Sequence, residues 1–121
     1  MEQRKVLVID DEIHVVHVVS IKLRNNDFRV YSANNGSEGY SIALKEKPDI
    51  IVLDSRMPAL TGLETAQKLL ESEETKSIPI ILLLSSYSDL LGDTRYPNIY
   101  VMIPKPFSPR ILLGIIQGIL D

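Results

Sequence analysis

The sequence predicts an α/β fold, a doubly wound sheet of five parallel strands with helices on both faces. Five short runs rich in Val, Ile and Leu recur along the chain. Segments whose apolar residues have helical spacing separate most of these runs. Because parallel strands need crossover connections of about a dozen residues or more, usually helices, this alternation indicates repeated βαβ units.

The five apolar runs have the composition and length of strands buried on both faces. Val and Ile dominate several of them, which is typical of a parallel sheet covered on both sides. The runs are KVLVID (5–10), FRVYSA (28–33), DIIVLD (49–54), IPIILLL (78–84) and NIYVMI (98–103).

Helices are predicted from apolar spacing together with start and stop signals. Ser37 marks one start and Pro48 the matching stop, while Ser108 and Pro109 have the types favoured at the N-cap and the first helical position. The predicted helices lie at about 15–23, 37–47, 63–72 and 108–120.

Size and composition describe one soluble globular domain over residues 1–121, with 45% hydrophobic and 24% charged residues. The net charge of −3 argues against direct binding to nucleic acid or to an anionic membrane. The absence of Cys excludes disulfides and thiol chemistry. No apolar run is long enough for a signal peptide or a membrane span, so we expect a cytoplasmic location.

Polar residues follow four of the predicted strands. The first ends in Asp10, Asp11 and Glu12, the third ends in Asp54, the fourth ends in Ser85 and Ser86, and the fifth ends in Lys105. The carboxyl ends of parallel strands meet at one edge of a sheet, where doubly wound folds bind ligands. Clustered carboxylates need a cation, and a set of oxygen ligands favours Mg²⁺. The lysine and the hydroxyl are groups that a phosphoryl group's oxygens require.

This ordered set resembles the receiver domain of two-component response regulators, the CheY-like family with a flavodoxin-like fold. The resemblance covers essentially the whole chain. Each motif is common alone, whereas the ordered set is specific. The motifs are Asp10-Asp11, Asp54 followed by Met57-Pro58 and Gly62, Ser85, and the triplet Lys105-Pro106-Phe107.

The resemblance implies that Asp54 accepts a phosphoryl group from a histidine kinase or phosphotransfer protein, and that the domain then switches conformation to control a partner or output domain. Lys105 would pair with a phosphoryl oxygen, and Ser85 would donate its hydroxyl. A cis peptide is expected between Lys105 and Pro106. Such a domain is not an enzyme; at most it phosphorylates itself from small donors and dephosphorylates itself.

The resemblance also implies a Mg²⁺ site. Asp11 would bind the ion directly, Asp10 directly or through water, and Asp54 and the main-chain carbonyl of Arg56 would complete the protein ligands. The side chain of Arg56 could also influence how water reaches an acyl phosphate on Asp54.

Two departures from the family pattern stand out. The family usually has an aromatic residue three positions before the lysine, where this chain has Met102, with Tyr100 two residues earlier. Residues 86–100, with Gly92 and Pro97, contain few core-spaced apolar residues. They predict a short or irregular fourth helix that is mobile in the unphosphorylated state.

Some apolar helix positions are expected to face water. Ile111 and Ile115 on the last helix, and Ile13 and Val16 on the first, point away from the predicted core face. Exposed apolar stripes suggest partner surfaces. We therefore expect the last helix to contact a second copy or a neighbouring domain, and the first helix to help dock the phosphoryl donor.

Other interpretations of single residues stay open. Asp10 and Asp11 could be only helix caps, Ser85 a strand terminus and Lys105 an exposed loop residue. His14 and His17 could share a metal, but no third ligand is evident, so a solvated helix face is expected. Gly114 and Gly118 are expected to let the last helix lie close to the sheet.

Two competing functions are compatible with the same residues. One is a pseudo-receiver or constitutive interaction domain that keeps the site but is not controlled by phosphorylation. The other is a Mg²⁺-dependent phosphotransferase or phosphatase with an Asp nucleophile. Such enzymes commonly have a second acid two residues after the nucleophile, where this chain has Arg56.

Overall fold

The computed structural model describes residues 3–86 and 96–121, in which five strands form one sheet. The order across the sheet is β2-β1-β3-β4-β5, and every neighbouring pair is parallel. This confirms the predicted fold class. The strands are β1 (Lys5–Ile9), β2 (Arg29–Ala33), β3 (Ile50–Asp54), β4 (Ile80–Leu84) and β5 (Ile99–Pro104).

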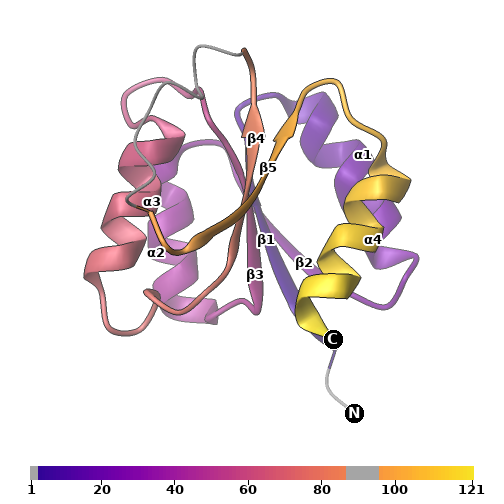
Figure 1. The fold of residues 1–121 in the computed structure, drawn as a ribbon, viewed down its shortest axis with the longest axis horizontal. Helices are drawn as coiled ribbons and strands as arrows, with labels where there is room; N and C mark the ends of the chain where they lie inside the picture. The colour runs from indigo at the N-terminus through magenta and orange to yellow at the C-terminus, as the bar shows by residue number, and fades with distance from the viewer. Residues whose placement is uncertain (1–2, 87–95) are drawn as a thin grey trace.

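Four helices in the described residues cover both faces of the sheet. They are α1 (Ile13–Arg24), α2 (Gly36–Glu46), α3 (Gly62–Glu71) and α4 (Pro109–Leu120). Figure 1 shows α1 and α4 on one face and α2 and α3 on the other. None of these helices has the length and apolar character needed to cross a membrane.

The alternation of side chains along each strand builds two apolar cores. In β1, Val6 and Val8 join the cluster under α1 and α4, whereas Leu7 and Ile9 join the cluster under α2 and α3. All four of these side chains are fully buried. The strand sequences are therefore continuous apolar runs, because helices cover both faces of the sheet.

Helix starts follow the capping chemistry in the sequence. The Ser108 hydroxyl accepts a hydrogen bond from the Ile111 N–H at 3.4 Å, and Pro109 is the first residue of α4, which confirms the predicted start. The N-cap of α2 is Asn35 rather than the predicted Ser37. The Asn35 side chain accepts a hydrogen bond from the Glu38 N–H at 2.8 Å.

Two predictions about helix surfaces need correction. Ile13 and Ile111 are exposed as predicted, but Val16 and Ile115 are only partly exposed because they also pack against the core. Gly114 and Gly118 do not bring α4 close to the sheet. A Cβ atom at either position would meet no atom within 4 Å, so both glycines lie on the open side of the helix.

The predicted irregular fourth helix concerns the segment between β4 and β5. Its residues 87–95 lie outside the part of the chain that the structure describes. The label α4 therefore belongs to the last helix of the chain (Figure 1).

Candidate functional site

The sheet topology brings the predicted polar residues to one edge. Asp10 follows β1, Asp54 ends β3, and Ser85 and Lys105 follow β4 and β5. These four strands are neighbours in the order β1-β3-β4-β5. Residues separated by most of the chain therefore meet at the carboxyl ends of the strands, as the rule for doubly wound folds requires.

The end of β3 is held tightly in place. All five residues of β3 are buried, and the strand pairs with β1 on one side and β4 on the other. Gly62 packs directly on this end: a Cβ atom there would lie 2.3 Å from the main-chain oxygen of Asp54. The acceptor predicted from the sequence is thus fixed by strand pairing and by a close backbone contact from the start of α3.

Lys105 lies among three carboxylates. Its Nζ is 2.7 Å from Glu12 Oε1, 2.9 Å from Asp10 Oδ2 and 3.3 Å from Asp54 Oδ1. Burial acts to lower the pKa of Lys105, but hydrogen bonds and charges from these acids outweigh it and raise the pKa above its ordinary value. The side chain is therefore a fixed positive charge at neutral pH.

The surroundings of Asp54 disfavour its ionised form. Burial, followed by the neighbouring Asp10 charge, raises the pKa of Asp54 to about 6, although Lys105 acts in the opposite direction. The Ser85 hydroxyl donates a hydrogen bond to Asp54 Oδ1 at 3.2 Å. At neutral pH the carboxylate is ionised and has both a cation and a hydroxyl donor beside it.

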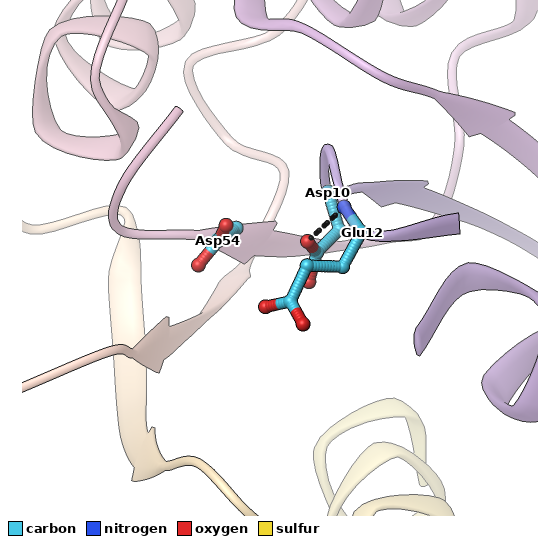
Figure 2. A group of neighbouring side chains, drawn as sticks. All are labelled: Asp10, Glu12 and Asp54. Carbon is cyan, nitrogen blue, oxygen red and sulfur yellow. Dashed lines mark hydrogen bonds between the residues drawn. The ribbon is translucent and has the colours of Figure 1, made fainter. Parts of the chain in front are cut away.

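The sequence placed Glu12 at this strand end without assigning it a role, and Figure 2 shows it beside Asp10 and opposite Asp54. The Glu12 N–H donates a hydrogen bond to Asp10 Oδ1 at 2.9 Å, and the Glu12 carboxylate reaches Lys105. This hydrogen bond from Lys105 is the main cause that lowers the pKa of Glu12. Its place directly after the acidic pair was a signal, but an acid at the start of a helix is also an ordinary cap.

Three acids of the described residues form a group that could hold a cation. Asp10, Glu12 and Asp54 offer carboxylate oxygens that all lie within 4.8 Å of one another. Asp10 Oδ2 is buried, and its contact within the described part of the chain is the ion pair with Lys105 Nζ at 2.9 Å. A buried oxygen of this kind fits a hard cation such as Mg²⁺.

The other predicted ligands lie next to this group rather than within it. Asp11 is exposed and lines a neighbouring hollow with Arg56, Met57 and Pro58. The Arg56 side chain donates a hydrogen bond to Ser86 Oγ at 3.1 Å. His14 and His17 are exposed and join no group of three potential ligand residues within the described ranges.

β5, the strand before Lys105, contains Met102 at the position where the family usually has an aromatic residue. Met102 and Tyr100 on β5 have 38% and 59% of their surfaces exposed. The peptide between Lys105 and Pro106 is cis, as the family resemblance implied. The Lys105 N–H donates a hydrogen bond to the Leu84 carbonyl at 2.9 Å, which ties the start of this loop to β4.

These features define a class of protein: a doubly wound domain with an acidic, cation-compatible site that presents one aspartate at a strand end. The chain belongs to the response regulator receiver domain family, whose model matches residues 6–117. Domains of this family are signalling domains of two-component systems and generally not enzymes. They bind Mg²⁺ at an acidic site and interact with histidine kinases or phosphotransfer proteins.

Particular relatives agree with this assignment. The chain is 30% identical to the phosphate regulon transcriptional regulatory protein PhoB of Pseudomonas aeruginosa, over 99% of this chain and 53% of that protein. It is 33% identical to the alkaline phosphatase synthesis transcriptional regulatory protein PhoP of Bacillus subtilis, over 97% of this chain and 48% of that protein. The chain thus spans about half the length of these curated relatives.

A solved structure of similar size shows the same fold. The chemotaxis response regulator CheY4 of Vibrio cholerae superimposes with a TM-score of 0.88 and is 30% identical. The match covers 98% of this chain and 99% of that one.

Proposed function

We propose that residues 1–121 form one receiver domain in which Asp54 accepts a phosphoryl group from a histidine kinase or phosphotransfer protein. The observation that carries this proposal is the placement of Asp54. It is a buried carboxylate at a strand end, with Lys105 Nζ at 3.3 Å and Ser85 Oγ at 3.2 Å. A nucleophile fixed in this way has the positioning that phosphoryl transfer requires.

The transfer is a simple exchange of bonds. An Asp54 carboxylate oxygen forms a bond to phosphorus while the bond from phosphorus to the donor imidazole nitrogen breaks. The nitrogen keeps the electron pair and takes up a proton. The acyl phosphate then carries more negative charge than the carboxylate did, and Lys105 and the Ser85 hydroxyl are the described groups placed to stabilise it.

We propose that Asp10, Asp11, Asp54 and the main-chain carbonyl of Arg56 hold Mg²⁺. When bound, the ion supplies positive charge that offsets the phosphoryl oxygens. The proposal is supported by the oxygen-only donor set and by the burial of Asp10 and Asp54, which each offer a carboxylate oxygen within 4.8 Å of the other. Asp11 would have to turn toward the other ligands from its exposed position.

Two surfaces of the domain are candidates for binding partners. A cavity of about 460 Å³ opens beside Lys105 and Ser85 and is also lined by His14, Val18 and Phe107. We propose that the phosphoryl donor docks on this side, against the start of α1. Ile111 and Ile115 on α4 are proposed to contact a second copy or a neighbouring domain, and the cytoplasmic location remains a prediction.

A second candidate function is a pseudo-receiver whose output does not depend on phosphorylation. The observation that favours it is Met102, which lies at the position of the family's switch aromatic residue and is partly exposed. If Asp54 is phosphorylated and neither the oligomeric state nor partner affinity changes, this second function is supported over the first.

The proposed function is tested by intact mass after incubation with acetyl phosphate, with and without Mg²⁺. We expect a Mg²⁺-dependent gain of one phosphoryl group in the wild type and none in Asp54→Asn. Asp27→Asn is the matched control, because Asp27 is an exposed aspartate in the turn before β2. No gain in the wild type, also with a phosphorylated histidine kinase as donor, would refute the proposal.

A further inference from the structure

Glu12 makes the closest contact with the lysine of the site. Its Oε1 lies 2.7 Å from Lys105 Nζ, nearer than Asp10 at 2.9 Å or Asp54 at 3.3 Å. An ammonium group has three protons to donate, so three carboxylates within this range can engage all of them. In this structure Lys105 is therefore shared, and its shortest contact is with an acid that is not the proposed acceptor.

The three carboxylates differ in how firmly they are held. The side chains of Asp10 and Asp54 are 0% and 2% exposed, whereas that of Glu12 is 58% exposed. The Glu12 main chain is fixed by its hydrogen bond to Asp10 Oδ1, but its carboxylate projects on the solvent side of Lys105. Water can replace Lys105 around Glu12 at little cost, and it cannot do so around the two buried acids.

The charge balance of the site must change when Asp54 is modified. An acyl phosphate carries one to two negative charges spread over oxygens that reach beyond the original carboxylate. Lys105 can donate to those oxygens only if it gives up part of its present set of partners. The partner that is easiest to give up is the exposed one.

We propose that Glu12 is a positioning residue that holds Lys105 in the unphosphorylated site and releases it to the phosphoryl group on Asp54. This inference rests on the proposed function of Asp54. The contact between Glu12 and Lys105 is made before transfer and lost during it, so it slows the gain of the phosphoryl group. Its removal should therefore speed phosphorylation.

An opposite role for Glu12 is also defined by the geometry. Glu12 belongs to the group of three acids within 4.8 Å, so it could act as a ligand for the cation instead of as a partner of Lys105. The two roles predict opposite effects of a Glu12 substitution on the rate of phosphorylation. Loss of a cation ligand weakens Mg²⁺ binding and slows phosphorylation, whereas loss of the hold on Lys105 speeds phosphorylation.

The test is Glu12→Gln in the full chain, which keeps the shape of the side chain and removes its charge. At saturating Mg²⁺ we expect its rate of phosphorylation from acetyl phosphate to rise about two- to fivefold, the range for loss of one exposed ion pair. Glu73→Gln is the matched control. It breaks an exposed glutamate–lysine pair of 2.9 Å, with Lys76, on a different part of the surface, and should leave the rate unchanged.

A second measurement does not depend on phosphorylation. In the protein without Mg²⁺, hydrogen exchange of the Lys105 ammonium group, followed by NMR, should be faster in Glu12→Gln than in the wild type. A slower phosphorylation rate with weaker Mg²⁺ binding by calorimetry would overturn the inference and assign Glu12 to the cation. Unchanged phosphorylation, or unchanged exchange at Lys105, would also overturn it.

Failure of the proposed function would look different. In that case the wild type takes up no phosphoryl group, and Glu12→Gln takes up none either. Exchange at Lys105 then decides alone whether Glu12 holds the lysine, and unchanged exchange rejects that part as well.

Discussion

The two strands that lead to Asp54 and Lys105 have different surroundings. β3 is paired on both sides and all of its residues are buried, while β5 is an edge strand of the described sheet in which only Ile103 is buried. Asp54 is therefore held by the most constrained part of the sheet, and Lys105 follows its most open part. The comparison teaches that Asp54 is positioned by the packing of its strand, whereas Lys105 is positioned by the three carboxylates around its ammonium group.

The largest effect is expected for a substitution in β3, the strand that is buried along its whole length. Leu53→Ala removes a fully buried side chain from β3 and should lower the free energy of unfolding by about 2–5 kcal/mol. Urea denaturation followed by circular dichroism measures this loss. A decrease below about 1 kcal/mol would contradict the tight packing of β3.

A smaller change tests the contact that supports the end of β3. Gly62→Ala places a Cβ atom 2.3 Å from the Asp54 main-chain oxygen, so the backbone must shift. We expect a loss of about 1–3 kcal/mol in the free energy of unfolding and slower phosphorylation of Asp54. The control is Gly114→Ala, where nothing lies within 4 Å and the better helix propensity of Ala should stabilise the protein by about 0.5–1 kcal/mol.

The raised pKa of Asp54 makes the free energy of unfolding depend on pH. Its pKa is about 6 in the folded protein against the ordinary value of 3.8 for aspartate, so the folded state binds more protons between these values. The contribution of Asp54 to stability is therefore favourable only at low pH and is lost as pH rises from about 4 to about 6.

The matching variant is Asp54→Asn without Mg²⁺. At pH 8 it should unfold with a free energy higher than that of the wild type, on the order of 1–3 kcal/mol. This difference should disappear near pH 4. Thermal unfolding of both proteins across this range measures it, and a difference that grows toward low pH would contradict the assigned shift.

The smallest effect is expected for a substitution in β5, the exposed edge strand. Met102 is 38% exposed, so Met102→Ala should change the free energy of unfolding by less than about 1 kcal/mol. The rate at which Asp54 is phosphorylated should stay within about twofold of the wild type. A larger loss in either measurement would show that β5 is as constrained as β3.

The sequence was sufficient to predict the five strands and the edge at which Asp10, Asp54, Ser85 and Lys105 meet. Apolar periodicity and the convergence of parallel strand ends are properties of the chain order alone. The cis peptide before Pro106 came with the family resemblance.

Side-chain direction was harder to predict, because it depends on packing between distant elements. The contact of Glu12 with Lys105 was not predicted, because it joins residues that are 93 positions apart. Gly114 and Gly118 were assigned to the wrong side of α4, because their spacing does not reveal which helix face meets the sheet. The roles of Asp11 and the Arg56 carbonyl as cation ligands stay predictions.

The candidate site takes its chemical groups from the ends of four strands that lie side by side in the sheet. Its residues are spread from Asp10 to Lys105, so the site is complete only when β5 has joined β4. Contacts of such long sequence separation form slowly and only with the complete topology. If Asp54 is phosphorylated as proposed, a chain in which β5 has not joined the sheet lacks Lys105 at the site, so phosphorylation would report that folding is complete.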